Sequence, residues 1–176
     1  MAKVFLSLGS NIDRRQHISS ALDALHQQFG ELLISSVYES EAVGFVGDNF
    51  YNLVVGLETD LGVGDLSLCL KKIEDENGRR RDCPKFSART LDIDILSCGQ
   101  MVGRVEGIEL PRREILENAF VLLPLAELVP EDIHPVVGKS YSQLWNDYEQ
   151  GAQKLWPVDF SWCDRLISRS DSSPCI

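Results

Sequence analysis

The order of apolar segments predicts an α+β fold, a ferredoxin-like split βαβ sandwich with a mostly antiparallel sheet and helices packed on it. Two observations support this prediction. Segments of strand-like and helix-like periodicity follow one another in the order strand, helix, strand, strand, helix, strand. Glycine-containing turns separate several of these segments, so we expect the helices on one face and the loops near one end of the sheet.

Periodicity and end signals set the expected bounds of each element. The expected strands are 4–8, 32–40, 50–59, 91–98 and 101–105, and the expected helices are 12–29, 65–76, 120–128 and 141–153. Gly9-Ser10-Asn11 breaks the first strand and offers capping side chains to the first helix, which Gly30 ends. The segments 41–49 and 78–90 have no clean period and are expected to be loops, the first of them mobile.

Length and composition are those of one soluble globule. The chain has 176 residues, of which 44% are hydrophobic and 25% charged. We expect a single domain over residues 1–160, followed by a loose polar tail over 161–176.

Charge and cysteine usage exclude several classes of partner. The formal net charge of −10 repels nucleic-acid backbones, so no nucleic-acid surface is expected. No apolar run approaches the roughly 20 residues that a membrane helix needs. Five scattered cysteines form neither a disulfide framework nor a zinc site, which predicts reduced thiols and a cytoplasmic location.

The most informative motif is the pair of aspartates in the strand 91–98. Residues two apart in a strand face the same side, so Asp92 and Asp94 point together while Ile93 and Ile95 point into the core. Their α-carbons lie about 6.5 Å apart, which allows both carboxylates to reach one hard cation or two neighbouring ones. A solvated acidic strand face is the alternative for an isolated Asp-x-Asp motif.

A basic run precedes the aspartates. Gly78 is followed by three arginines, and Lys85 and Arg89 come before Asp92. A solvated basic surface is one explanation. However, carboxylates that hold Mg²⁺ and guanidinium groups that hold phosphate oxygens are the two halves of a nucleoside triphosphate site. No Walker-type glycine loop is present, so the P-loop route to ATP is excluded.

From about Val4 to Pro130 the sequence resembles the 6-hydroxymethyl-7,8-dihydropterin pyrophosphokinases, a family of folate-pathway enzymes. The resemblance rests on Leu8-Gly9-Ser10-Asn11, Ser36-x-Tyr38, Phe50-x-Asn52, Gly78-Arg79, Ala88-Arg89-Thr90-Leu91-Asp92-Ile93-Asp94-Ile95 and Phe120-Val121-Leu122-x-Pro124-Leu125. It implies that the terminal diphosphate of ATP passes to the hydroxymethyl group of the pterin, giving AMP and a pterin diphosphate. The Arg-Thr-Leu-Asp-x-Asp stretch is the most specific of these motifs.

The resemblance also implies roles for residues at the phosphate end of the site. Asp92 and Asp94 would hold two Mg²⁺ ions, and Arg79 and Arg89 would be the catalytic residues that offset charge on the transferred group. The implied ATP-binding residues are Glu74, Arg81 and Arg112. ATP is then a co-substrate, and positioning matters more than a strong base.

The resemblance places the pterin between two aromatic side chains, Phe50 and Phe120, with Asn52 paired to its ring edge. Ser40 and Val43 would supply backbone contacts. From composition alone, packing in the core is the favoured explanation for the two phenylalanines. The loops 41–49 and 78–90 would close over the reactants and exclude water.

Some positions depart from the family pattern. Arg112-Arg113 follows Leu110-Pro111 where the family usually has histidine, and Asn118 replaces an arginine. Arg112 keeps a donor for phosphate, whereas Asn118 removes one cation from the pocket.

Two other functions therefore stay open beside a monomeric pyrophosphokinase. One is a weakened paralogue that binds a pterin or nucleotide as a regulator or acts on a modified pterin. The other is a ferredoxin-like interaction module whose acidic strand is only solvated.

Overall fold

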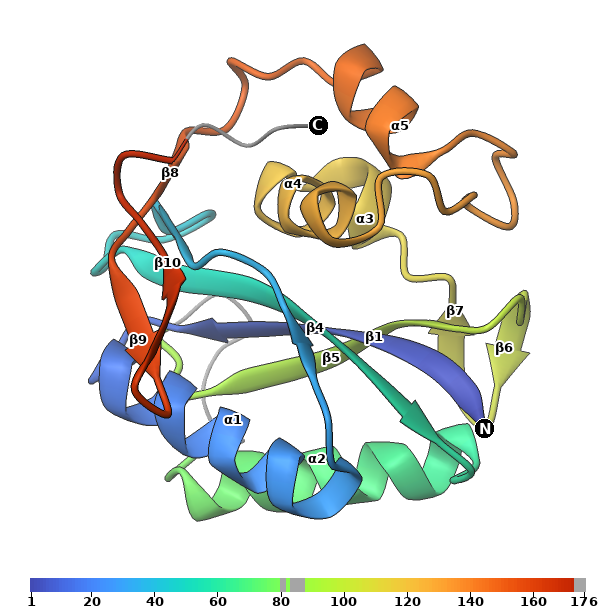
Figure 1. Cartoon of the computed structure of the whole chain (residues 1–176), viewed down its shortest axis with the longest axis horizontal. Coiled ribbons are helices and arrows are strands. Elements are labelled where there is room, and N and C mark those ends of the chain that lie inside the picture. Colours follow the sequence, from blue (N-terminus) through green and yellow to red (C-terminus); the bar gives the residue numbers. More distant parts are fainter. Residues whose placement is uncertain (80–81, 83–87, 173–176) are drawn as a thin grey trace.

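The computed structural model describes residues 1–79, 82 and 88–172, and Figure 1 shows the arrangement of its elements. The strands are β1 (Ala2–Ser10), β2 (Leu33–Ile34), β3 (Tyr38–Ser40), β4 (Phe50–Thr59), β5 (Asp92–Cys98), β6 (Gly103–Val105), β7 (Ile108–Leu110), β8 (Leu155–Pro157), β9 (Phe160–Trp162) and β10 (Arg165–Ser168). The helices are α1 (Arg14–Phe29), α2 (Val63–Glu76), α3 (Glu114–Glu117), α4 (Ala119–Leu128) and α5 (Tyr141–Asp147).

The central sheet has six strands in the order β5-β1-β4-β3-β8, with the short β2 also paired to β4. All of its strand pairs are antiparallel. β1 pairs with β4 along its whole length, from Ala2 opposite Thr59 to Ser10 opposite Tyr51. The α+β class, the mostly antiparallel sheet and the packed helices are thus confirmed.

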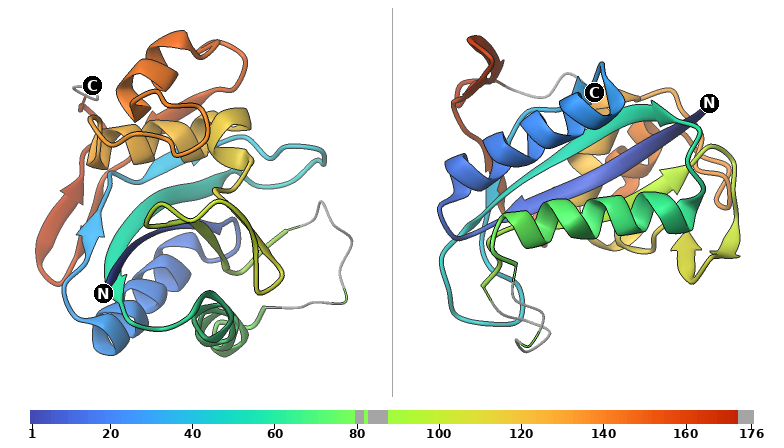
Figure 2. Two further views of the ribbon diagram at one scale, coloured as in Figure 1. Left: turned by 90° about the vertical axis from the view of Figure 1, so that its right-hand side faces the viewer. Right: turned by 90° about the horizontal axis from the view of Figure 1, so that it is seen from below.

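Helices cover both faces of this sheet, with α1 and α2 on one side and α3, α4 and α5 on the other (Figures 1 and 2). The expectation of helices on one face was therefore wrong. The physical reason is visible in β4, where the consecutive residues Leu53, Val54 and Val55 are all fully buried. A strand with apolar residues on both of its faces needs a cover on each side.

Two apolar cores result, one on each face. The core beneath α1 and α2 takes alternate strand residues, including Leu6, Leu53, Val55, Ile93 and Ile95. The core beneath α4 takes the opposite alternation, namely Phe5, Val54 and Leu96, together with Leu122 and Leu125 of α4.

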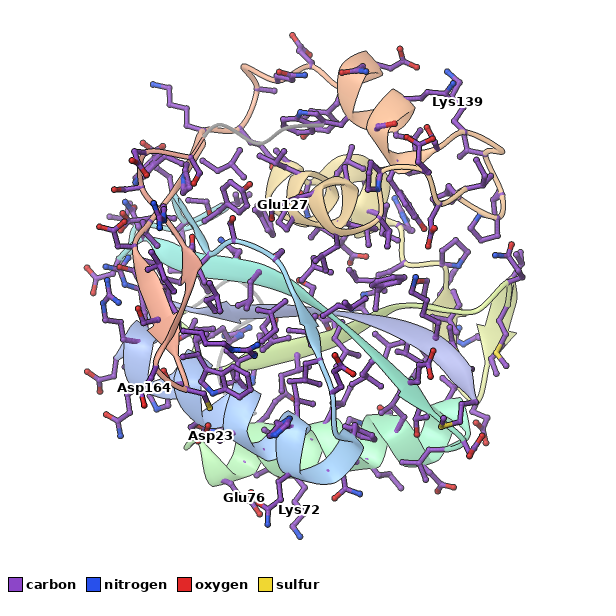
Figure 3. The ribbon with its side chains drawn as sticks, viewed as in Figure 1. Asp23, Lys72, Glu76, Glu127, Lys139 and Asp164 are labelled. Carbon is purple, nitrogen blue, oxygen red and sulfur yellow. The ribbon has the colours of Figure 1, made fainter. Side chains whose placement is uncertain are left out.

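The strand 50–59 has its predicted bounds, whereas the expected strand 32–40 is interrupted between β2 and β3. Its interruption has a polar cause. Glu127 of α4, labelled in Figure 3, accepts hydrogen bonds from the Ser36 backbone N–H at 2.8 Å and from Ser36 Oγ at 2.6 Å. The backbone N–H of Ser36 is thus bonded to a side chain of α4 in place of a neighbouring strand.

The bounds of other elements also differ from those expected from the sequence. The first helix begins at Arg14, and its N-cap residue is Asp13, whose side chain makes no capping hydrogen bond. The helix therefore does not take its cap from residues 9–11, as was predicted. The fourth predicted helix ends at Asp147, six residues early. The strand β7, which pairs with β6 as a hairpin, was not expected from the sequence.

The expected loose tail is wrong for residues 161–168. β9 and β10 pair as a hairpin, and Figure 3 shows Asp23 of α1 close to this hairpin. Trp162 is buried and donates from Nε1 to Asp23 Oδ1 at 2.8 Å. Ser168 Oγ accepts the Val37 backbone N–H at 3.0 Å. These contacts fasten the segment to α1 and to the strand region before β3.

Within the described ranges, no helix is long and apolar enough to cross a membrane.

Candidate active site

A cavity of about 480 Å³ opens at the end of the sheet where β1 ends and β4 and β5 begin, on the α4 side. Its lining is Ser7, Gly9, Ser40, Glu41, Val43, Phe45, Phe50, Asn52, Arg89, Asp92, Asp94, Leu96, Arg112, Glu114, Glu117, Asn118, Phe120 and Val121. It contains nine of the twelve predicted site residues. Of the other three, Glu74 and Arg79 lie beside Asp92, and Arg81 lies outside the described residues.

The strand alternation aims both aspartates into this cavity. Asp92 lies opposite Gly9 and Asp94 opposite Ser7 in the β1–β5 register, and all four line the cavity. Ile93, between the aspartates, belongs to the core under α1 and α2. Period-two geometry thus separates the polar and apolar halves of β5.

Guanidinium groups stand next to both carboxylates. Arg79 Nη2 lies 3.6 Å from Asp92 Oδ1, and Arg112 Nη2 lies 3.3 Å from Asp94 Oδ1. Arg112 also pairs with Glu114 through Nε at 3.3 Å. Burial, followed by the negative charge of Asp92, raises the pKa of Asp94, while Arg112 opposes this effect. The carboxylates are therefore held close together at an electrostatic cost that a bound cation relieves.

Glu74, at the end of α2, is buried behind the aspartates. Its Oε2 accepts the Ile93 backbone N–H at 3.1 Å, because β5 is the edge strand and α2 packs beside it. Burial raises the pKa of Glu74, the Ile93 N–H lowers it, and the charge of Asp92 raises it again. Glu74 and Asp92 thus form one acidic group at the edge of the sheet.

Arg79 provides the most direct indication that the site can bind an anion. Its Nε and Nη1 atoms are buried and have no hydrogen-bond partner among the described residues. A buried guanidinium N–H without an acceptor is costly, and an anion beside Asp92 would satisfy it. Arg112, by contrast, is already engaged by two carboxylates.

The opposite end of the cavity is aromatic. Phe50 from β4 and Phe120 from α4 both line it, and Phe45 packs edge-to-face on Phe50 with ring centroids 6.2 Å apart. Asn52 Nδ2 donates to Ser40 Oγ at 2.7 Å, which fixes the orientation of its amide. A Cβ atom at position 9 would lie 3.4 Å from Asn52 Oδ1, so glycine leaves the cavity open beside this amide.

Sequence reasoning gave no role to several lining residues, among them Glu41, Phe45, Glu114 and Glu117. Glu114 and Glu117 lie on α3, an element of four residues that periodicity does not reveal. Val43 was predicted and does line the cavity, although its side chain is 51% exposed.

The described lining is acidic as a whole, with five carboxylates and two guanidinium groups. No group of three or more His, Cys, Asp or Glu side chains in the described part of the chain is arranged to hold a metal ion by itself. Both facts fit Mg²⁺ bound with a polyphosphate, because this ion uses one or two carboxylates and completes its octahedron with phosphate oxygens and water. The residues present fit the ion.

The antiparallel sheet and a cavity with carboxylates and arginines at one end and aromatic rings at the other define the class, an α+β enzyme that transfers a phosphate-containing group to a small molecule. The profile of the 7,8-dihydro-6-hydroxymethylpterin-pyrophosphokinase (HPPK) family matches residues 5–130. The chain belongs to this family.

Curated relatives agree over most of the chain. A 2-amino-4-hydroxy-6-hydroxymethyldihydropteridine pyrophosphokinase of Aquifex aeolicus is 39% identical over 146 residues, which are 82% of this chain and 91% of that protein. A protein of the same name from Pseudomonas aeruginosa is 37% identical over 133 residues, 73% of this chain and 82% of that protein.

Among solved structures, the wild-type HPPK-DHPS of Plasmodium falciparum resembles this fold with a TM-score of 0.69 at 15% identity. The match covers 98% of this chain and 50% of that chain, so the present chain spans about half the length of that protein. At this identity the likeness concerns the fold alone.

Proposed function

We propose that this chain transfers the terminal diphosphate of ATP to the hydroxymethyl group of 6-hydroxymethyl-7,8-dihydropterin in folate biosynthesis. The hydroxymethyl oxygen forms a bond to the β-phosphorus, the bond between this phosphorus and the oxygen bridging to the α-phosphorus breaks, and AMP leaves with that oxygen. The hydroxyl proton is released. The observation that carries the proposal is the pair Asp92 and Asp94, which share one cavity with arginines and aromatic rings.

Asp92 and Asp94 are the residues that would hold Mg²⁺, two ions in our proposal, with ATP as co-substrate. Bound there, the metal would neutralise phosphate charge and orient the triphosphate. The acidic lining supports this role, because a triphosphate approaching five carboxylates without a divalent cation meets net repulsion.

Arg79 and Arg89 would act on the transferred group itself. Two buried N–H groups of Arg79 lack a protein acceptor within the described residues, so phosphate oxygens would complete their hydrogen bonds. Arg89 lines the cavity directly before β5, next to the metal-binding pair. Fixed positive charge in a partly buried cavity stabilises the negative charge that shifts between oxygens during transfer.

The pterin would lie at the aromatic end, stacked between Phe50 and Phe120. Asn52, oriented by Ser40, would pair with the ring edge, and the backbone near Ser40 and Val43 would complete the contact. Stacking between aromatic rings and one oriented amide would both position the acceptor hydroxyl and select a flat heterocycle.

The remaining ATP contacts are assigned to Glu74, Arg81 and Arg112. Glu74 lies at the end of α2 behind Asp92, where it would contact the nucleoside. Arg112 would exchange part of its pairing with Asp94 and Glu114 for phosphate oxygens. The contact from Arg81 rests on the sequence resemblance alone.

Incubation with ATP and hydroxymethyldihydropterin, followed by separation of nucleotides, tests the proposal. One AMP should form for each pterin diphosphate, and chelation of Mg²⁺ should abolish both products. ADP formation, or ATP turnover independent of the pterin, would overturn it. Calorimetry with a nonhydrolysable ATP analogue, with and without Mg²⁺, separates a binding protein from a protein with a merely solvated acidic strand.

We also propose a cytoplasmic monomer. The free thiols of Cys69, Cys98 and Cys163 fit a reducing compartment, and sedimentation measures the oligomeric state.

A further inference from the structure

Asn11, in the turn between β1 and α1, is 3% exposed although it carries an amide side chain. It does not cap the helix, which begins at Arg14 and has Asp13 as its N-cap residue, without a capping hydrogen bond from that side chain. Its side chain instead makes two hydrogen bonds to residues far apart in the sequence. Oδ1 accepts the Arg89 backbone N–H at 2.7 Å, and Nδ2 donates to the Asp48 carbonyl oxygen at 3.0 Å.

The contact with Arg89 is a two-point contact. The Asn11 backbone N–H also donates to the Arg89 carbonyl oxygen at 3.0 Å, so both peptide groups of Arg89 are bound to Asn11. This pairing lies just beyond the end of the β1–β5 ladder, whose last pair is Gly9 opposite Asp92. The backbone of Arg89 is thereby fixed relative to the aspartates three and five residues further on.

The contact with Asp48 reaches the chain just before Phe50, which lines the aromatic end of the cavity. Asp48 lies near the end of the 41–49 loop, two residues before Phe50, which opens β4. The same loop has a second anchor that does not involve Asn11, since Arg14 Nη1 donates to the Asn49 carbonyl oxygen at 3.0 Å. Asn11 therefore joins the 41–49 loop to Arg89, just before β5, whereas Arg14 contacts only the first of these two loops.

We propose that Asn11 is a positioning residue that couples the pterin side of the cavity to Arg89. Movement of the 41–49 loop on ligand binding is transmitted through the Asn11 amide to the backbone that carries the Arg89 guanidinium. The inference rests on the proposed function for its ligand. Its structural part, one amide bonded to both loops, is tested without any ligand.

Nuclear magnetic resonance of the ligand-free protein tests the structural part. The amides of Asn49, which shares a peptide group with the Asp48 carbonyl, and of Arg89 report the two bonds separately. Asn11→Ala should shift both resonances. Asn11→Asp keeps the acceptor for the Arg89 N–H and loses the donor to Asp48, so it should shift chiefly that of Asn49.

Two variants serve as matched controls. Arg14→Ala releases the 41–49 loop from its other anchor and should leave the Arg89 amide in place. Ser168→Ala removes another buried side chain that bonds to a distant segment, here both backbone groups of Val37, and should move neither resonance nor change turnover. If Ser168→Ala has the same effects as Asn11→Ala, the role of Asn11 is only structural and the proposal is wrong.

Addition of the pterin to the unaltered protein should shift the amides of Phe50 and Asn52 and, through Asn11, that of Arg89. In Asn11→Ala the first two should still shift and the Arg89 amide should not. Unchanged Phe50 and Asn52 resonances in the unaltered protein would refute the proposed pterin site instead. An Arg89 response that survives in Asn11→Ala would refute the coupling.

Kinetics provide the second readout. A misplacement of catalytic groups by about 1 Å can cost roughly 100-fold in rate, so Asn11→Ala should lower kcat about 10- to 100-fold. Asn11→Asp, with the Arg89 bond retained, should raise the KM for the pterin and recover most of kcat. Equal losses of kcat in the two variants, at equal thermal stability, would overturn the assignment.

Discussion

The two faces of the central sheet differ in what they bury. The face under α1 and α2 is filled by side chains alone, with Leu6, Leu53 and Ile95 fully or almost fully buried. The α4 face begins as a core around Phe5 and Val54 and then opens into the cavity lined by Asp92 and Asp94. One face holds the fold together, and the other is divided between packing and chemistry.

This division teaches that adjacent residues of one strand serve opposite purposes. Asp94 and Ile95 are neighbours in β5, yet they point to different faces of the sheet. A carboxylate beside another carboxylate costs stability, whereas a buried isoleucine supplies it. The functional half of the strand can be held in place only because the other half is well packed.

The largest effect is expected from the aspartates. Asp92→Ala or Asp94→Ala should lower the rate of AMP formation at least about 1,000-fold, because each removes a proposed metal ligand. Thermal unfolding should stay close to that of the unaltered protein, because both side chains face the cavity, and the loss of an ion pair with Arg79 or Arg112 is offset by relief of the repulsion between the aspartates. Loss of the folded state in place of a clean loss of turnover would break the distinction between the faces.

Arg89→Ala should have the next largest effect, a loss of about 100-fold or more in kcat. Its charge is proposed to act on the transferred group in the transition state, so ATP binding should weaken less than turnover. Steady-state kinetics with both substrates measures the two effects. A change confined to the KM for ATP would assign Arg89 to ground-state binding instead. Arg104→Ala is the control, since Arg104 is exposed on β6 and does not line the cavity.

The strand face and the acidic pair could be predicted from sequence because both depend on a period of two residues. Asp92 and Asp94 required only that 91–98 be a strand. Asn11 could not be assigned in this way. Its position before a helix predicted a cap, and only the folded chain shows that its amide bonds to two loops.

Tertiary contacts also account for the elements that sequence reasoning misplaced. Trp162 and Ser168 lie in a polar segment, and their burial depends on partners more than 100 residues away, Asp23 and Val37. Glu127 interrupts the expected strand 32–40 from α4 in the same manner. Local periodicity contains no information about such distant hydrogen bonds.

Ile95→Ala is the counterpart of the aspartate variants on the opposite face. Truncation of this buried side chain should destabilise the protein by about 2–4 kcal/mol, the usual cost of a cavity in a packed core. Chemical denaturation measures the loss. Turnover per folded molecule should change less than about threefold, because Ile95 does not line the site. A 100-fold loss of kcat at full folding would show that the two faces are not separable.

The smallest effect concerns the start of α2, where Gly62 provides no capping side chain. Glu106, at the tip of the β6–β7 hairpin, accepts the Gly64 backbone N–H at 2.7 Å and so supplies the missing acceptor from a distant segment. Glu106→Ala should cost about 0.5–1 kcal/mol in denaturation, since it removes both a cap and a negative charge at a helix N-terminus.

Two matched variants separate these contributions. Glu106→Gln keeps an acceptor oxygen and should lose about half as much stability, with the difference shrinking at high salt. Glu109→Ala removes an equal charge from the same hairpin and should be neutral within about 0.3 kcal/mol. If Glu109→Ala lost as much stability as Glu106→Ala, the general charge of the hairpin would explain the effect. The cap that Glu106 gives to α2 would then not contribute to stability.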